Sequence, residues 1–272
     1  MLPTLSCRYF QRAFLYSVPI GGLAGLIGLG GGEFRLPVLT QMIGFPPRAA
    51  IPLNLLISLA TLAFALVIRN HAVPASGALA HLPEVAGLMI GGVFSAVYGV
   101  NLLLRMSDRR LTAVMATLLA ALGLLLLIEA FVPFHGSMFG TEPVFVRVLA
   151  GLVTGLVVGV VSSMLGVAGG ELLIPALLFL FGADIKIAGT ASLLLSLAIV
   201  TTGVWRYHKA GALPMAGGPQ RIALSMTAGS LIGVALGGLA VAVAPVAFLK
   251  IMLGSVLIIA AAKTVKANRA AR

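Results

Sequence analysis

The sequence predicts an all-α polytopic membrane protein built from two inverted-topology repeats. Hydrophobic residues make up 60% of the chain and charged residues only 9%, with a mean hydropathy of +1.13. A soluble domain carries roughly 25% charged residues, so a soluble fold is excluded. Apolar runs near the roughly 20 residues that a helix needs to cross a bilayer recur along the chain. In addition, segment 28–58 recurs without a gap at 166–196.

Eight long apolar runs are expected to be transmembrane helices. Two shorter apolar pieces, residues 34–43 and 172–181, follow the first and the fifth run and are too short to cross as straight helices. A Gly-Gly-Glu string precedes each piece and a glycine follows it, so each is expected to be a broken or re-entrant segment. The eight runs are 13–32, 49–68, 83–104, 111–132, 146–169, 188–205, 222–244 and 246–262.

The internal repeat is more specific than the apolar composition alone would produce. Of 31 aligned positions 11 are identical, and Gly-Gly-Glu-x-x-x-Pro occurs in both copies, at residues 31–37 and 169–175. A duplicated apolar segment interrupted by Gly and Pro is typical of the binding site of a secondary transporter. We expect a first membrane repeat over residues 1–132, an external linker over 133–145 and a second membrane repeat over 146–272.

The positive charges favour inverted over parallel repeats. If each short piece returns the chain to the side it left, only Arg69, Arg147 and Lys186 fall on one side. The positive-inside rule then makes the other side, and both termini, cytoplasmic. The basic residues lie between or beyond the apolar runs, as membrane topology predicts, so we expect no nucleic acid as a partner. The expected partners are a lipid bilayer and a small anionic substrate. The basic residues on the cytoplasmic side are Arg8, Arg12, Arg48, Arg105, Arg109, Arg110, Arg206, Lys209, Arg221, Lys263, Lys266, Arg269 and Arg272.

Glycines crowd the two breaks and are the first candidates for a substrate site. Non-helical backbone at membrane depth is tolerated only where protein or a water-filled cavity surrounds it. The helix after each break presents free N–H groups and a positive dipole end, which suit an anion. Tight helix packing is the alternative explanation. The candidate substrate-binding glycines are Gly30, Gly31, Gly32, Gly169 and Gly170.

Glu33 and Glu171 occupy the same position in the two copies. A carboxyl group near the membrane interior is costly, so both residues are candidates for proton coupling. Alternatively, each caps its own helix start by accepting backbone N–H bonds. Arg35 has Leu173 at its position in the second copy. Its guanidinium either pairs with Glu33 or contacts the anion.

Small polar residues near the breaks complete the candidate site. Asn54 and Ser58 are four residues apart and so share a helix face. Such side chains can bind an oxyanion through uncharged donors, or they can join helices to one another. The candidates are Asn54, Ser58, Ser163, Thr190 and Ser192.

Sites typical of soluble enzymes are missing from the sequence. The four histidines show no ligand spacing, and no nucleotide-binding glycine motif is complete. The single cysteine, Cys7, excludes an internal disulfide. We therefore expect no metal, no cofactor and no enzymatic activity.

The strings GLGGGEFRLP at 28–37 and GVAGGELLIP at 166–175, followed by Gly-Thr-Ala-Ser at 189–192, resemble the sulfite exporter TauE/SafE family. These proteins are bacterial and archaeal inner-membrane permeases. The resemblance covers essentially the whole chain and implies transport of sulfite, sulfonates or related organosulfur anions. Pro52 stands where the second copy has Thr190, so the two half-sites are not equivalent. We expect a proton-coupled secondary transporter, with an anion channel or an integral-membrane enzyme or assembly factor as alternatives.

Overall fold

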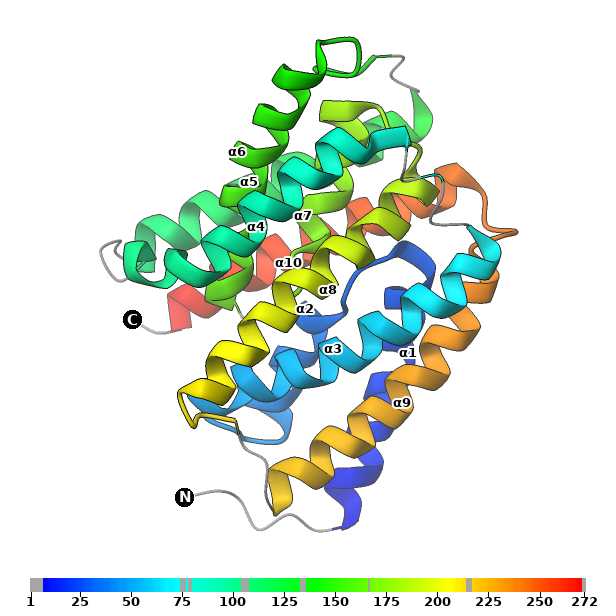
Figure 1. Ribbon diagram of the computed structural model, residues 1–272. Helices are drawn as coiled ribbons and strands as arrows, with labels where there is room; N and C mark the ends of the chain where they lie inside the picture. The colour runs from blue at the N-terminus through cyan, green and yellow to red at the C-terminus, as the bar shows by residue number, and fades with distance from the viewer. Residues whose placement is uncertain are drawn as a thin grey trace.

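The computed structural model is all-helical, and it describes residues 7–73, 77, 80–103, 108–132, 136–165, 167–213 and 217–270. No strand occurs among these residues, and eight of their helices contain 21–26 residues each (Figure 1). In chain order the elements are α1 (Cys7–Ile27), α2 (Gly32–Pro37), η1 (Val38–Met42), α3 (Pro47–Ala72), α4 (Leu82–Leu103), α5 (Asp108–Phe131), α6 (Val144–Leu165), α7 (Gly170–Pro175), η3 (Ala176–Leu180), α8 (Ile185–Lys209), α9 (Gly218–Ala240) and α10 (Val246–Ala270).

The helices have the length and apolar composition of a multi-pass membrane protein. Within the described residues, four segments are long and apolar enough to cross a membrane: Ala49–Ala72, Val144–Ser162, Ile185–Lys209 and Gly218–Ala240. Shorter apolar stretches occur in three of the four remaining long helices, α4, α5 and α10, and across α7 and η3. The all-α polytopic class is therefore confirmed, and the number of eight transmembrane helices stays a prediction.

The first and fifth helices end earlier than the sequence predicted. The run expected at 13–32 overlaps α1, which ends at Ile27 because Gly28, and after it Gly31, have φ angles of 96° and 68°. Side chains with a Cβ rarely adopt that left-handed conformation, so glycine is required where the helix breaks. In the second half, α6 ends at Leu165, and Gly169 has a φ of 78°. The breaks thus fall at corresponding positions of the two copies.

Each short segment after a break is a six-residue α-helix followed by a five-residue π-helix. The helices α2 and α7 end at Pro37 and Pro175, and the next five residues form the π-helical segments η1 and η3. Proline lacks a backbone N–H and its ring clashes with the carbonyl four residues earlier, which disturbs the α-helical hydrogen-bond pattern. The π-helical turn is the usual local response to such a disturbance.

The first short segment returns the chain to the end of the molecule where α1 begins. Val38 and Ile43, at the two ends of η1, pack in one buried cluster with Ala13 of α1, Ala50 of α3 and Ile222 of α9. These three partners lie near the starts of their helices, so α1, α3 and α9 begin at the same end. We call it the basic end, because the described residues Arg12, Arg206, Lys209 and Arg221 lie there.

The second short segment returns to the opposite end. Met138 and Phe139 donate backbone hydrogen bonds of 3.2 Å and 2.7 Å to the carbonyl oxygens of Phe179 and Leu180, at the close of η3. The same stretch leads into α6 at Val144, so η3 ends near the place where α6 begins. We call this the linker end, because residues 136–143 join α5 to α6 there.

The most extensively packed helix pairs are α1 with α9, α4 with α6 and α5 with α10. Figure 1 shows α1 and α9 side by side along one flank, with α3 and α8 crossing the middle of the molecule. Glycines permit the close approaches, because a Cβ on Gly87 or Gly91 would overlap α6 backbone and one on Gly21 would overlap Ser230 of α9. Each of the three helix pairs joins a helix from the first half of the chain to a helix from the second half.

Candidate functional site

The two breaks pack directly against each other in the middle of the protein. A Cβ placed on Gly170 would lie 3.3 Å from the Gly28 carbonyl oxygen and 3.3 Å from Leu29 Cα. A Cβ on Gly32 would lie 3.5 Å from Val167 Cα, and one on Gly30 would overlap the side chain of Ala168. The structure thus brings Gly30, Gly32 and Gly170 of the predicted site together.

Gly31 and Gly169 complete this arrangement as the residues that precede α2 and α7. A Cβ on Gly31 would lie 3.1 Å from Arg35 Nη2, and a Cβ on Gly169 would lie 3.3 Å from Ser162 Cβ. All five predicted glycines therefore lie in the breaks, and Gly30, Gly32 and Gly170 meet the other break, whereas the neighbours of Gly31 and Gly169 belong to their own halves. Gly166, which opens the second motif, falls outside the described residues.

Predicted polar residues surround the first break and donate to its backbone. Asn54 Nδ2 donates a 3.0 Å hydrogen bond to the Gly32 carbonyl oxygen, and Ser192 Oγ donates a 2.7 Å hydrogen bond to that of Gly28. Ser58 Oγ accepts a 2.9 Å hydrogen bond from Arg35 Nη1. Because these donors bind loop carbonyls that have lost their helical partners, they hold the break in its shape.

In the second half, Ser162 contacts the break. Its Oγ donates to the carbonyl oxygen of Val167. The predicted residue Ser163 is the next one in α6, and its side chain lies outside the described residues.

Arg35 is fully buried and lies against the first break. Its Nη2 donates to the carbonyl oxygen of Gly30, in addition to the Nη1 bond to Ser58. Glu33 lies close enough for electrostatic attraction, but no ion pair joins Glu33 to Arg35 among the described residues. Of the two predicted roles for Arg35, direct ion pairing with Glu33 is therefore not seen.

Glu33 and Glu171 lie close enough for their carboxyl groups to interact across the contact between the breaks. Glu171 is buried and Glu33 half-buried. Glu33 Oε1 and Glu171 Oε2 are buried and have no partner among the described residues. The duplicated acids thus form one pair, and the capping alternative stays a prediction.

Arg69 is a buried residue that sequence reasoning missed. Its Nη1 donates to the carbonyl oxygens of Gly25 and Leu26, at 2.9 Å and 2.6 Å, where α1 ends. Its Nε and Nη2 donate at 3.0 Å each to Thr190 Oγ1 and to the Lys186 carbonyl oxygen of α8. The guanidinium therefore satisfies carbonyls that the break leaves without helical partners.

Thr190, a predicted site residue, accordingly binds Arg69 and lies on the linker-end side of the break. Arg69 directly follows the apolar run expected at 49–68, and the membrane-spanning segment in the structure, Ala49–Ala72, includes it. An ionisable residue within a membrane-spanning run is functional or paired by default. Because Arg69 was counted among the charges of the loops, it was not predicted to be a site residue.

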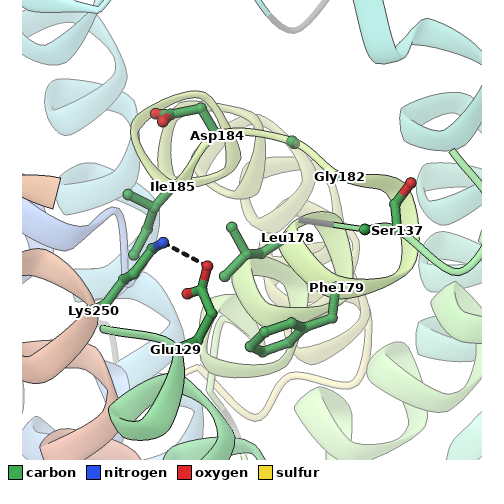
Figure 2. Close-up of a pocket in the computed structure, with 10 residues that line it drawn as sticks. Glu129, Ser137, Leu178, Phe179, Gly182, Asp184, Ile185 and Lys250 are labelled. Carbon is green, nitrogen blue, oxygen red and sulfur yellow. Dashed lines mark hydrogen bonds and ion pairs between the residues drawn. The ribbon is translucent and has the colours of Figure 1, made fainter. Parts of the chain in front are cut away.

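A cavity of about 440 Å³ opens at the linker end, beside η3 (Figure 2). Lys250 of α10 crosses it to Glu129 of α5, with 2.6 Å between Nζ and Oε1. Asp184 and Ser137 also line it. In the part of the chain that the structure describes, no group of three or more His, Cys, Asp or Glu side chains could hold a metal ion.

A family model described as "Sulfite exporter TauE/SafE" matches residues 7–140 and 149–272. The chain belongs to the TauE/SafE family. This match confirms the resemblance that the two glycine motifs carry, and it makes the protein a member of a membrane transporter family. The internal unmatched stretch of the TauE/SafE chain, residues 141–148, overlaps the linker and the start of α6. No curated protein and no solved structure matches the chain.

Proposed function

We propose that this protein is a proton-coupled secondary transporter of small organosulfur anions, such as sulfite or sulfonates, across the cytoplasmic membrane. One observation carries the proposal: the two duplicated breaks lie against each other at the contact between the halves. Discontinuous helices that meet at a repeat interface form the substrate site in many transporter folds. Family membership supplies the chemical class of the anion.

The helix packing supports two inverted repeats, over residues 1–132 and 146–272 with a linker at 133–145. The two halves can be compared by matching α1, α3, α4 and α5 with α6, α8, α9 and α10, in that order. Under this match the pair α1–α9 corresponds to the pair α6–α4, and the pairs α3–α8 and α5–α10 correspond to themselves. The contact of α3 with α9 likewise maps onto that of α8 with α4. The two halves begin at opposite ends, as inverted topology requires.

The ends of the helices support a bacterial or archaeal cytoplasmic membrane protein with its basic end inside. Among the described residues, Arg12, Arg206, Lys209 and Arg221 lie at the basic end, and the linker end holds Arg69, Arg147, Lys186 and Lys250, the last paired with Glu129. Arg69 is buried and Arg147 is paired with Glu84 at 2.7 Å, which leaves little free positive charge there. By the positive-inside rule the basic end, with both termini, is cytoplasmic.

The charge around the breaks suits an anion. Arg35 and Arg69 are both buried beside the first break, and neither forms an ion pair with a described carboxylate. Their guanidinium groups stay charged, so a bound anion would lower the cost of burying them. The nearest acids, Glu33 and Glu171, interact with each other. When that pair holds a proton it carries one negative charge, so the two guanidinium groups give the site a net positive charge.

The acid pair supplies a place for proton coupling. Two carboxyl groups this close do not both ionise without mutual repulsion, which favours a proton on one of them. Glu33 and Glu171 come from opposite halves, so a relative movement of the halves would separate them. Loss of this contact would change the proton's binding site at the moment when access changes. We propose that substrate movement and proton release are linked in this way.

Reconstitution of the protein into liposomes tests the proposal. Labelled sulfite, thiosulfate, sulfoacetate and taurine should be tested in turn, with sulfate for comparison. We expect at least one organosulfur anion to accumulate against its gradient when a pH gradient is imposed, and to exchange with unlabelled anion on the other side. An anion channel would show flux without exchange or pH-driven accumulation. Flux equal to that of empty liposomes for the whole set would contradict the proposal.

A further inference from the structure

A second cavity, of about 170 Å³, opens at the basic end between the two halves of the chain. Leu55 of α3 and Ala96 of α4 line it from the first half, and Ser162 of α6 and the last turns of α8 line it from the second. Arg69 closes the contact between α3 and α8 at the linker end through its bonds to Thr190 and the Lys186 carbonyl. The two halves are therefore joined at the linker end and separated by the cavity at the basic end.

The polar part of this cavity is positive. Arg206 Nη1 donates to the Ala96 carbonyl oxygen. No carboxylate of the described residues pairs with Arg206. Tyr207 and Ser162 add hydroxyl groups, and no acidic residue lines the cavity. A guanidinium with free N–H groups next to hydroxyl donors is a good match for a tetrahedral or pyramidal oxyanion.

The cavity reaches the second break. Ser162 lines the cavity and also donates to the Val167 carbonyl oxygen within the break. A Cβ on Gly169 would lie 3.5 Å from Ser162 Oγ. One side chain thus separates the cavity from the candidate substrate site, so an anion held at Arg206 would be placed beside the break.

The cavity at the linker end has the opposite charge balance. There the ammonium of Lys250 is neutralised by Glu129, and Asp184 adds a second carboxylate (Figure 2). A small anion would be repelled by the net negative lining, whereas it would be attracted by Arg206 at the basic end. The two cavities are therefore not equivalent for an anion.

We infer that the basic-end cavity is a docking site for a small organosulfur oxyanion on its way to or from the breaks. Arg206 binds the sulfite or sulfonate group, and Tyr207 donates a further hydrogen bond. The apolar wall formed by Leu55, Ile199 and Val200 receives the remainder of the anion. The identity of the anion rests on the proposed function, whereas the oxyanion preference rests on the lining residues.

Thiol labelling in the cavity tests the site without a transport assay. Gly203 lines the cavity, and an added Cβ there lies 3.4 Å from Leu55 Cδ1, an ordinary contact, so Gly203→Cys should fold. In a Cys7→Ser background it would carry the only thiol. Two methanethiosulfonate reagents of similar size, one bearing a sulfonate and one a trimethylammonium group, are compared after correction for their rates with a free thiol.

We expect the sulfonate reagent to label Gly203→Cys about tenfold faster than the cationic one, and from the basic end only. Removing the charge with Arg206→Gln should abolish this preference, since a hydrogen bond to a charged group is worth about a factor of ten in affinity. Arg206→Lys should keep much of it. Arg221→Gln removes an exposed charge at the same end, outside the cavity, and should leave the preference unchanged.

Competition in the unaltered Arg206 background gives a second measurement that does not depend on the folding of any Arg206 variant. Ethanesulfonate at millimolar concentration should slow the labelling, and the same concentration of choline chloride should not. A cationic preference, an anionic preference that survives Arg206→Gln, or labelling that ethanesulfonate leaves unchanged would overturn the inference. A protein that labels as expected but moves no anion in liposomes would instead count against the proposed function alone.

Discussion

Ser192 donates a hydrogen bond of 2.7 Å to the carbonyl oxygen of Gly28, across the boundary between the two halves of the chain. The donor lies in the helix that follows the second break, and the acceptor lies in the first break. Gly170 packs against the same carbonyl from the start of α7. The two breaks are therefore held together, and a structural change in either one should also alter the other.

Valine at Gly170 or Gly32 should abolish anion binding. A Cβ at Gly170 would lie 3.3 Å from the Gly28 carbonyl oxygen, and one at Gly32 would lie 3.0 Å from Asn54 Nδ2, so the added methyl groups would push the breaks apart. Binding is measured as the rise in melting temperature with added anion, about 2.7 kcal/mol of stabilisation at 100 times Kd. Gly22→Ala, whose Cβ would meet only the Gly233 carbonyl oxygen at 3.9 Å, should keep the shift. A normal shift in both valine variants would reduce the glycines to packing residues.

Glutamine at Glu33 or Glu171 should uncouple transport from protons. Glutamine can donate to the remaining carboxylate without taking up a proton, so it mimics the pair in its protonated form. Exchange of labelled for unlabelled anion should continue in either variant, and accumulation driven by a pH gradient should fall to the level without a gradient. Glu84→Gln, which removes the partner of Arg147 far from the breaks, serves as the control for losing a buried acid. Loss of stability with an unchanged pH profile would make the acids structural caps instead.

Replacing Arg69 by Gln should destabilise the protein. The change removes the donors to the Gly25 and Leu26 carbonyl oxygens and to Thr190. Each buried acceptor left without a donor costs about 1–3 kcal/mol, so the melting temperature should fall by about 4 °C or more. Lys186→Gln removes one exposed hydrogen bond, to the Ala242 carbonyl oxygen, at the same end and should change it by less than about 2 °C. Equal small effects of the two changes would show that Arg69 does not hold the break.

Cysteines at Thr141 and Gln220 should react from opposite sides of the membrane. Thr141 lies in the exposed linker, and Gln220 is exposed near the start of α9 at the basic end. With Cys7 replaced by Ser, a membrane-impermeant reagent added to intact cells should label Thr141→Cys only. Gln220→Cys should be labelled only after the cells are opened. Labelling of both positions in intact cells would rule out inverted repeats with a cytoplasmic basic end.

The sequence was sufficient to predict the class of the fold and the place of the breaks. Length and apolar composition located one run for each long helix, and the duplicated Gly-Gly-Glu-x-x-x-Pro string located α2 and α7. Helix ends were less predictable. For example, α8 continues to Lys209, beyond the run expected to end at 205, because a helix can extend past its apolar part into polar surroundings.

The contacts of individual side chains could not be predicted from the sequence. Ser162 contacts the break, and this contact depends on the rotation of α6 about its axis. Arg69 binds carbonyls of α1 that are 43 and 44 residues away in sequence, and nothing local marks them as acceptors. Such contacts depend on how the helices pack, and the apolar pattern alone does not specify that packing.

Exchange of a labelled organosulfur anion across liposomes containing the wild-type protein or Gly170→Val tests the central claim most directly. The account predicts rapid exchange of at least one anion among sulfite, thiosulfate, sulfoacetate and taurine by the wild-type protein. It also predicts at least a tenfold slower exchange by Gly170→Val, although that variant still inserts and elutes as a single folded species. Exchange by Gly170→Val at the wild-type rate would contradict the claim that the paired breaks form the anion's path.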